Sequence, residues 1–361
     1  MKKIGIFTFH RAHNYGALLQ AYALQTFLER SHDVYFIDYY NSNVYNGYKV
    51  FKPIGRNILK WPVRIYNNIA NYKVNIRRNK VFNNFIVNNL KICKNSKKTY
   101  ENFDVLITGS DQVWNSYITG GLKDEYTLNV GGSNLKRISY AASVGNINIV
   151  KDNKDLYVKK LNKLDYISVR EQELKELLSE YLDDKKVTNV LDPTFLLTSD
   201  EWNKIIESNE KVKDKYILAY VVKPNDEYVK IVNELSKKTG LKVICFDNNI
   251  SENILERSIF SDPFDFIRLI KNAEYIVTTS FHATVFSIIF NKNFWVVPHS
   301  ATGSRVTELL NKFKLTDRVV NSLEEFEKKE IDVAINYQKV NSIIEIESNK
   351  SKDWLLNSIE K

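Results

Sequence analysis

The chain alternates between short apolar runs and longer segments in which apolar residues recur every three or four positions. Short runs of this kind predict strands, and the longer segments predict helices. The predicted strands span residues 3–9, 34–38, 104–108, 137–142, 166–169, 216–222, 242–246, 275–279 and 294–297. The predicted helices span residues 16–30, 154–163, 171–181, 226–238, 263–271, 281–290 and 304–312.

This alternation predicts an α/β protein with two domains. Strands that alternate with helices form parallel sheets joined by right-handed crossovers. The pattern breaks at Asp192-Pro193, because a proline disfavours helix in the residue before it, and a second series of elements follows. We therefore expect two doubly wound, Rossmann-like domains facing a cleft, at residues 1–192 and 193–334. A C-terminal helix at 335–361 is expected to pack back on the first domain.

Residues 39–100 interrupt the alternation with a basic, asparagine-rich and aromatic insert. Its apolar pairs predict broken amphipathic helices around Pro53 and Pro62. The whole chain has 52 Lys and Arg against 43 Asp and Glu, a net charge of +9, but the insert holds thirteen of the basic residues and no acidic one. The remainder of the chain is therefore slightly acidic. This uneven charge, and the lack of a recognisable nucleic-acid-binding motif, argue against nucleic acid as a partner.

Composition argues against several broad classes. With 43% hydrophobic residues the chain is expected to fold, and no apolar window approaches the roughly 18–20 residues of a membrane span. The first apolar run stops at His10, which predicts a strand rather than a signal peptide. Cys93 and Cys245 lack paired or zinc-ligand spacing, so we expect a reduced, cytoplasmic setting. Phosphate-loop, dinucleotide-binding and zinc motifs are missing, so neither cofactor nor metal is expected.

Ligands of open α/β sheets bind where strands end and helices begin, and four such junctions carry unusual polar residues. The first is the segment of residues 9–20, which holds two histidines and an arginine just before a predicted helix. Helix N-termini favour anions, so this loop is a candidate binding site. The alternative is a plain loop in which Asn14 caps the helix and Gly16 makes a tight turn. The candidate ligands are Asn14, Tyr15, Gly16 and Gln20.

The second junction follows the strand at 104–108. Backbone amides at Gly109 and Ser110 could hold an anion or a sugar, and Asp111 could accept a sugar proton, with Gln112 beside it. The alternative is a helix start with Asp111 as its cap.

The third and fourth junctions carry an arginine and a histidine. Arg170 ends a strand, where a guanidinium could pair with a carboxylate or phosphate; pairing with Glu171 is the structural alternative. His282 starts a helix between Ser280 and Thr284, where backbone amides favour an anion. Further candidate neighbours of the same pocket are His299 and Arg305.

At these junctions the sequence resembles the polysaccharide pyruvyl transferase family. Six motifs follow one another along nearly the whole chain, and together they are specific although each alone is weak. They are Asn14-Tyr15-Gly16-Ala17-Leu18-Leu19-Gln20-Ala21-Tyr22-Ala23-Leu24, Gly109-Ser110-Asp111-Gln112-Val113-Trp114, Ser139-Tyr140-Ala141-Ala142-Ser143-Val144-Gly145, Ser168-Val169-Arg170-Glu171, Leu191-Asp192-Pro193-Thr194 and Ser280-Phe281-His282-Ala283-Thr284-Val285-Phe286.

The resemblance implies a glycosyltransferase-B-type fold with its site in the cleft between the domains. It also implies transfer of pyruvate from phosphoenolpyruvate onto two hydroxyls of a sugar, which gives a cyclic ketal and phosphate. By the same resemblance, Arg170 clamps the donor carboxylate or phosphate, and His282 is the general acid or a phosphate ligand. The loops at residues 14–20 and 109–112 would face the acceptor sugar.

Two other functions remain open at this point. A glycosyltransferase of the same fold would need a carboxylate near the ribose of a nucleotide sugar, for which Asp262, Asp265 and Glu274 are candidates. A non-catalytic scaffold of a glycan-assembly complex would tolerate loss of both Arg170 and His282.

The basic insert predicts where the acceptor is found. Its charges and aromatic residues are suited to docking at an anionic membrane surface or to gripping a lipid pyrophosphate. Together with the phosphoenolpyruvate and the surface-polysaccharide precursor that the resemblance implies, the expected partners therefore include a lipid carrier of that precursor and the inner face of the cell membrane. The alternative for the insert is a set of solvated helices.

Overall fold

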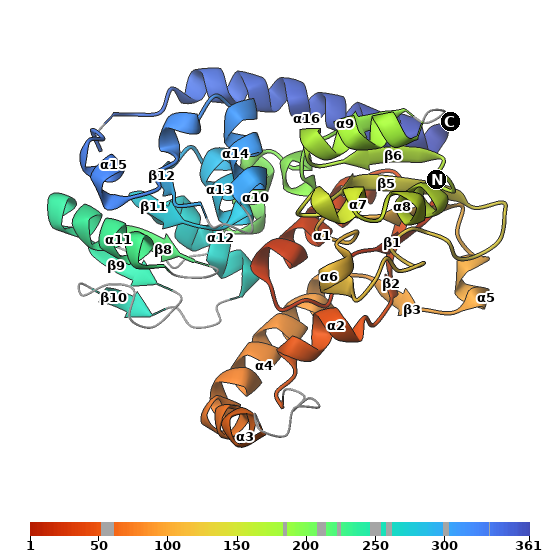
Figure 1. The fold of residues 1–361 in the computed structure, drawn as a ribbon, viewed down its shortest axis with the longest axis horizontal. Helices are drawn as coiled ribbons and strands as arrows, with labels where there is room; N and C mark the ends of the chain where they lie inside the picture. Colours follow the sequence, from red (N-terminus) through yellow and green to blue (C-terminus); the bar gives the residue numbers. More distant parts are fainter. Residues whose placement is uncertain are drawn as a thin grey trace. The chain divides into compact units, whose positions relative to one another are not determined.

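The protein divides into two compact α/β units, which are described separately (Figure 1). The computed structural model describes residues 1–51, 61–182, 186–207, 214–221, 225–245, 254–257, 262–298, 303–331 and 333–361. The first unit comprises Met1–Leu196 with Ser348–Lys361, and the second comprises Leu197–Glu347.

The first unit is built on a parallel sheet in the order β3-β2-β1-β4-β5-β6-β7. Its strands are β1 (Lys3–Phe7), β2 (Asp33–Asp38), β3 (Ile92–Lys94), β4 (Val105–Thr108), β5 (Lys136–Ala142), β6 (Tyr166–Val169) and β7 (Val187–Asn189). The strand order reverses between β1 and β4, which pair in register from Ile4↔Val105 to Phe7↔Thr108. This reversal is a topological switch point, the position where open α/β sheets bind ligands at the carboxyl ends of their strands.

Helices cover this sheet. They include α1 (Tyr15–Leu28), α2 (Ser42–Tyr45), α5 (Lys97–Tyr100), α6 (Ser116–Thr119), α7 (Asn148–Lys151), α8 (Lys154–Leu161) and α9 (Gln172–Tyr181), with the 3-10 turns η1 (Asn46–Tyr48) and η3 (Pro193–Leu196). Most residues of α1 are buried, because the helix lies against both the sheet and η3. The sheet beside it is tightly packed: a Cβ at Gly5 would lie 3.0 Å from Leu106 and closer still to Ile37.

The second unit has a parallel sheet in the order β10-β9-β8-β11-β12, with its reversal between β8 and β11. Its strands are β8 (Tyr216–Tyr220), β9 (Lys242–Cys245), β10 (Ile254–Arg257), β11 (Tyr275–Thr278) and β12 (Asn293–Val296). Its helices include α10 (Ser199–Ile205), α11 (Asp226–Thr239), α12 (Pro263–Asn272), α13 (Phe281–Ile289), α14 (Gly303–Lys312) and α15 (Leu323–Glu327), with the 3-10 turn η4 (Thr316–Arg318). The rings of Trp202 and Phe286 meet edge to face at 5.1 Å in its core.

The predicted strands and helices match the structure to within two residues at each described end. Three short strands, β3, β7 and β10, were not predicted. The alternative in which Asp111 caps a helix is wrong: the next helix is α6, and Asn115 caps it by accepting hydrogen bonds from the amides of Tyr117 and Ile118. Gly16 lies inside α1 and makes no turn.

The C-terminal helix α16 (Tyr337–Glu360) begins in the second unit, and its last part belongs to the first. There Ser351 Oγ accepts a hydrogen bond of 3.0 Å from the amide of Leu191, and the ring of Trp354 lies 6.4 Å from that of Tyr140. Lys136 Nζ donates to the carbonyl of Ile359. Within the described residues, none of the helices, α16 included, combines the length and apolar character of a membrane span.

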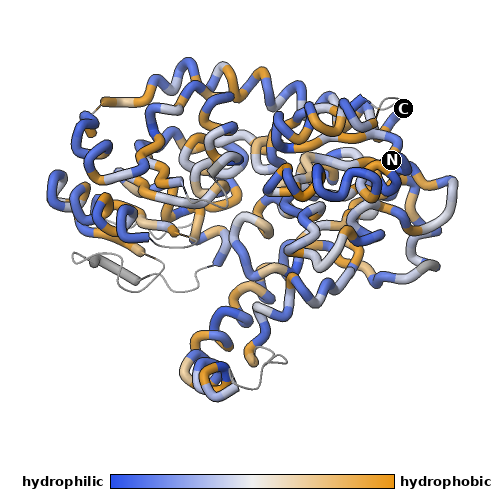
Figure 2. The backbone as a smooth tube through the Cα atoms, viewed as in Figure 1, coloured by the Kyte–Doolittle hydropathy of each residue, from blue (hydrophilic) through white to orange (hydrophobic). Residues whose placement is uncertain are grey.

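The two longest helices in the described part of the basic insert are α3 (Trp61–Ala70) and α4 (Tyr72–Asn89). Hydrophobic residues recur along both (Figure 2). The second half of α4 is anchored in the first unit, because Phe82, Phe85 and Ile86 are buried there. The imidazole of His13, from the loop after β1, stacks on Phe82 with ring centroids 5.2 Å apart.

This anchor suppresses protonation of His13. Burial lowers the pKa of His13 to about 4, and the positive charge of Arg78 on α4 contributes to the shift. The histidine is therefore neutral in the folded protein near neutral pH, whereas in the unfolded chain it titrates near its ordinary value of 6.5.

We expect the folded state to lose stability as the pH falls from 6.5 towards about 4, because only the unfolded chain then takes up a proton at His13. His13→Gln should flatten the curve of melting temperature against pH across that interval. Burial also lowers the pKa values of His10 and His32, but both are unchanged in the variant, so the difference between the two curves isolates His13. Parallel curves for variant and wild type would contradict the assignment.

Candidate functional site

The loops after β1 and β4 meet at the switch point of the first unit. The amide of Gly109 donates to the carbonyl of Phe7 at 2.8 Å, and Thr8 Oγ1 donates to the carbonyl of Ser110 at 2.8 Å. A Cβ at Gly109 would lie only 3.2 Å from Thr8 Cβ, so a larger residue would force the loops apart. The first two predicted junctions are thus neighbours in space.

A chain of side-chain hydrogen bonds extends from these loops to the carboxyl ends of β5, β6 and β7. We call it the carboxyl-edge network; its members are Thr8, Gln20, Ser110, Ser143, Arg170, Glu171, Asp192 and Thr194. Gln20 Nε2 donates to Thr8 Oγ1 at 2.9 Å, and Ser110 Oγ donates to Asp192 Oδ2 at 3.2 Å. Thr194 donates to the other carboxylate oxygen of Asp192 through its hydroxyl and its amide.

Arg170 occupies the middle of this network. Its Nη1 donates to Asp192 Oδ2 at 3.0 Å and its Nε to Glu171 Oε1 at 3.3 Å. Glu171 Oε1 also accepts a hydrogen bond of 2.7 Å from Ser143 Oγ. One guanidinium therefore ties together the segments that follow β5, β6 and β7.

Arg170 carries a buried positive charge that two neighbouring carboxylates compensate. Its side chain is only 3% exposed. Burial alone would lower its pKa, but the negative charges of Glu171 and Asp192 outweigh that effect and hold the pKa above its ordinary value. The pairing with Glu171 that the sequence left open as the structural alternative is present. With two carboxylates against one guanidinium, this geometry favours a positioning role over direct binding of an anionic donor.

Asp111 is the half-buried carboxylate beside this network. Its backbone has φ +80°, in the left-handed region, which costs a residue other than glycine roughly 1–2 kcal/mol. The conformation is held by hydrogen bonds from the amide of Ser143 to the Asp111 carbonyl, at 3.1 Å, and from the amide of Gln112 to its carboxylate, at 2.8 Å. Strained residues of this kind cluster at functional sites.

The charge of Asp111 reaches two neighbouring elements. It acts on Arg170 in the network and on Tyr48 in the insert, whose pKa is raised first by burial and then by this carboxylate. Arg78 lies over the ring of Tyr48 at 5.8 Å. The root of the insert and the β4 loop thus bring an aspartate, a tyrosine and an arginine to one region of the first unit.

A second polar group lies on the β1 and β2 side of the switch point. His10 Nδ1 lies 3.0 Å from the carbonyl of Thr8, and its ring stacks on Phe36. His10, whose Nε2 is 3.9 Å from Asp38 Oδ1, and Arg11, which donates to the same carboxylate, hold the pKa of Asp38 well below its usual range. Asp38 is therefore ionised and neutralises Arg11, so the first loop presents little net positive charge.

Several predicted ligands have structural roles in the first unit. Asn14 is the N-cap of α1, accepting a hydrogen bond of 3.1 Å from the amide of Ala17. Tyr15 packs on Phe82. Gln20 and Ser110 were predicted as direct substrate ligands, but both are completely buried, so their hydrogen bonds position the loops instead. Gln112 is half-buried and accepts a hydrogen bond from Asn115.

In the second unit, His282 follows β11 at the switch point between β8 and β11. Ser280 is the N-cap of α13. The hydroxyl of Thr284 is fully buried and donates to the carbonyl of Ser280 at 2.9 Å. Thr284 was predicted as a ligand, and its burial gives it a positioning role. His282 is half-buried in the first turn, with Phe281 edge-on at 5.2 Å. Its imidazole is therefore held at the positive end of the α13 dipole.

The remaining predicted residues lie farther along this unit. Arg305 is buried in the first turn of α14, which contacts α13. His299 lies outside the described residues.

The carboxylates proposed for a nucleotide sugar already have structural partners. Asp262 and Asp265 form the capping box of α12, with Asp262 Oδ1 accepting a hydrogen bond of 2.8 Å from the amide of Phe264. Asp265 also pairs with Arg268. Glu274 forms an ion pair with Lys215 at 3.3 Å. This geometry does not favour the glycosyltransferase alternative.

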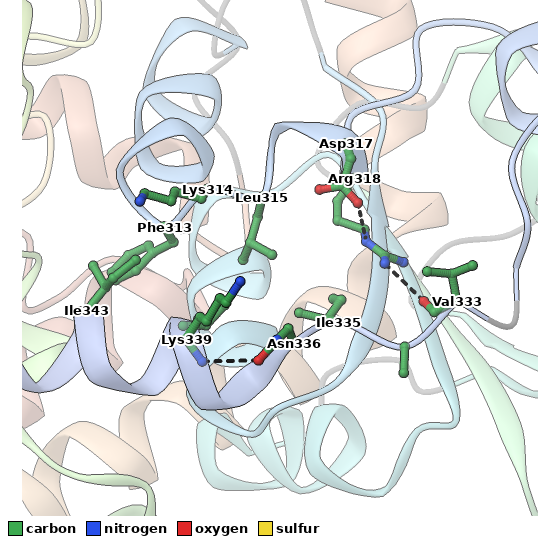
Figure 3. A pocket seen from close by; sticks show the side chains of 12 residues that line it. Phe313, Lys314, Leu315, Asp317, Arg318, Val333, Ile335, Asn336, Lys339 and Ile343 are labelled. Carbon is green, nitrogen blue, oxygen red and sulfur yellow. Dashed lines mark hydrogen bonds and ion pairs between the residues drawn. The ribbon is translucent and has the colours of Figure 1, made fainter.

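A cavity of about 200 Å³ in the second unit lies where η4 approaches the start of α16 (Figure 3). Its walls are largely apolar, with Arg318 held by Asp317 and by the carbonyl of Val333. None of the predicted site residues lines it. No group of three or more potential metal ligands occurs among the described residues.

Sequence reasoning overlooked Asp192 as a site residue and considered Glu171 only as a structural partner of Arg170. Asp192 and Glu171 both stand in the recognised motifs, next to a proline and to Arg170, so the signal was present. What the sequence does not reveal is that β7 lies beside β6, which brings Asp192 to the guanidinium.

Solved structures with a similar fold include two proteins with bound nucleotides. MnaA from S. aureus, solved with UDP, has 16% identity and a TM-score of 0.50 over 98% of this chain and 90% of its own. The glycosyltransferase SsfS6 from Streptomyces sp. SF2575, complexed with thymidine diphosphate, has 10% identity and a TM-score of 0.51 over 99% of both chains. These likenesses show the fold alone, which is of the glycosyltransferase-B type, as predicted.

None of the curated protein sequences matches this chain. A family match, in contrast, covers most of it and includes all six motifs at which the site residues lie. The model of the polysaccharide pyruvyl transferase family matches residues 14–301, and the chain therefore belongs to this family of transferases.

Proposed function

We propose that the protein transfers pyruvate from phosphoenolpyruvate to two hydroxyls of a sugar in a surface-polysaccharide precursor, forming a cyclic ketal. The observation that carries this proposal is that a group able to exchange a proton follows the strand at the switch point of each sheet. These groups are Asp111 after β4 and His282 after β11. Membership of the pyruvyl transferase family supports pyruvyl transfer as the reaction. In this proposal His282 is its general acid and Asp111 its general base.

The proposed chemistry balances with these two groups. His282 donates a proton to the methylene carbon of the enol, which leaves the central carbon cationic. A sugar hydroxyl adds to this carbon and gives its proton to Asp111. The bond from the central carbon to the phosphate oxygen then breaks, and the second hydroxyl adds to the same carbon to close the ring. Of the two protons that the hydroxyls lose, one restores His282 and the other leaves with the phosphate. Phosphoenolpyruvate is a co-substrate, and the reaction as proposed needs no cofactor.

The two substrates have different charges, which supports a division of binding roles. The donor carries a carboxylate and a phosphate. It is suited to the second unit, where His282 lies at the N-terminus of α13 and Arg305 in the first turn of α14. The acceptor is suited to the first unit, where Asp111 and the polar loops after β1 and β4 offer hydrogen bonds to hydroxyls. In this proposal Arg170 positions those loops, and a lipid pyrophosphate carries the acceptor sugar.

The proposal predicts that phosphate is released from phosphoenolpyruvate only when a suitable acceptor is present. The assay incubates the protein with phosphoenolpyruvate and a panel of lipid-linked and nucleotide-linked sugars, and measures phosphate and product mass. The product should gain the mass of pyruvate less one water. The same panel without phosphoenolpyruvate is the control, and sugar transfer from a nucleotide sugar in that arm would support the glycosyltransferase alternative. Failure across the panel, with no binding of phosphoenolpyruvate, would refute the proposal.

His282→Gln and Asp111→Asn should each lower the rate of phosphate release by about 10²–10⁴-fold, because each removes one proton-transfer group. Both replacements should leave the melting temperature nearly unchanged, since asparagine tolerates the left-handed backbone at position 111 and His282 is only half-buried. His32→Gln is the control and should keep its activity, because His32 precedes β2 at the amino edge of the first sheet, opposite the carboxyl edge where Asp111 lies. Normal turnover by either site variant would refute the assigned roles.

Arg170→Ala should lower the free energy of unfolding by about 3–5 kcal/mol, because it leaves two buried carboxylates without their cation. Denaturant unfolding measures the change, and Arg30→Ala, at an exposed position just after α1 where the guanidinium lies over the ring of Phe27, should change stability by less than about 1 kcal/mol. A variant as stable as wild type that fails to bind phosphoenolpyruvate would instead identify Arg170 as a direct ligand of the donor.

A further inference from the structure

In the outer part of the basic insert, polar side chains are buried and apolar side chains are exposed to solvent. We call this part the hairpin tip; it comprises α3 and residues 72–80 of α4, which pack against each other and project from the sheet of the first unit (Figure 1). Asn68 and Asn75 are buried in it, whereas Val63, Tyr66 and Ile69 are 62%, 70% and 68% exposed. A soluble helix normally buries its apolar face and exposes its polar one.

Hydrogen bonds explain why polar side chains point inward. Asn75 Nδ2 donates to the carbonyl of Val50 at 3.1 Å, and Asn79 Nδ2 donates to the carbonyl of Tyr48 at 2.9 Å. These amides satisfy backbone carbonyls of the segment that precedes α3 within the insert. Polar contacts therefore occupy part of the inward face of the tip, and apolar residues of α3 and of the first turns of α4 are left exposed.

The exposed apolar residues form a stripe rather than scattered points. Trp61, Ile65 and Ile69 are four residues apart, so they share one face of α3. Tyr72 and Ile76 have the same spacing at the start of α4. The exposed members of the stripe are Trp61, Ile65, Tyr66, Ile69, Tyr72 and Ile76, whereas Val63 and Val74 are exposed on the other side of their helices. A contiguous apolar surface of this kind marks a site of interaction.

The charge of the insert indicates what the stripe meets. Residues 39–100 contain no acidic side chain, and Lys73, Arg77 and Lys80 are exposed beside the stripe on α4. A second copy of this chain would place like charges against one another, which disfavours self-association through this face. Trp61, Tyr66 and Tyr72 are residues typical of the boundary between lipid headgroups and acyl chains.

We propose that the hairpin tip docks in the interface of an anionic lipid membrane. Its apolar stripe enters the acyl boundary, and its lysines and arginines contact the negatively charged headgroups. The root of α4 fixes the tip to the site, because Phe82 is buried against His13 and Tyr15, which immediately precede and begin α1. Docking therefore holds the loops after β1 and β4 at a membrane-linked acceptor. This inference concerns binding alone and does not depend on the pyruvyl chemistry.

The test is sedimentation of the whole protein with vesicles, without donor or acceptor. Vesicles of equal parts phosphatidylglycerol and phosphatidylcholine should bind the protein, and vesicles of phosphatidylcholine alone should not. Trp61 gives a second signal, because it is exposed while Trp114, Trp202 and Trp295 are buried. Its emission should shift to shorter wavelength on binding, and Trp61→Phe should remove that shift.

The charge contribution is tested by Lys73→Gln/Arg77→Gln/Lys80→Gln. Each cation near an anionic surface changes binding about fivefold, so the triple variant should bind anionic vesicles about a hundredfold more weakly. Lys151→Gln/Lys159→Gln/Lys163→Gln removes the same charge from exposed positions around α7 and α8 and should bind like wild type. Equal loss in both variants would show that net charge, and not the tip, is responsible, and would overturn the proposal.

The apolar contribution is tested by Ile65→Ser/Tyr66→Ser/Ile69→Ser. This variant should lose vesicle binding while its melting temperature stays within the range of wild type, because the three side chains are exposed. Tyr117→Ser/Leu156→Ser/Ile346→Ser, at exposed positions elsewhere, should keep binding. Equal binding to neutral vesicles would overturn the proposal. So would a wild-type dimer in sedimentation velocity that the apolar variant abolishes, together with no vesicle binding.

Discussion

The buried ion pairs of Arg170 are the interaction on which the site in the first unit depends. Asp192 and Glu171 come from segments that follow different strands, and one guanidinium holds both. Taking these charges out of water is costly unless every partner is present, so the group is stable only when the strands lie in their proper order. Through Ser110 the same network reaches the β4 loop, where it supports the strained backbone of Asp111.

The two sheets have the same arrangement of strands at their switch points but carry different side chains there. In each, the strand order reverses beside the strand whose following segment carries the candidate proton-transfer group. In the first unit that segment is irregular and presents an aspartate among hydroxyls, which suits a neutral, hydroxyl-rich ligand. In the second it enters α13 directly and presents a histidine at a helix N-terminus, which suits an anion. The architecture thus provides two positions, and the local backbone determines the ligand each favours.

The sequence predicted the central strands because strands buried on both faces are continuous apolar runs, as β4 and β11 are. It missed β3, β7 and β10, three of the four edge strands of the two sheets, which are three or four residues long and have little apolar periodicity. The fourth edge strand, β12, is an apolar run and was predicted. It located Arg170, Asp111 and His282 correctly at strand ends. It could not predict that Gln20, Ser110 and Thr284 are completely buried, because burial depends on contacts between residues far apart in the chain.

The second half of α4, which is buried, packs as part of the first unit, and the hairpin tip does not. Since β2 and β3 are parallel neighbours, the chain needs a crossover between them, and the buried half of α4 provides it. Residues beyond that crossover add nothing to the packing of the strands. Natural selection can therefore alter the tip while the sheet, the ion pairs and the loops at the switch point are inherited unchanged.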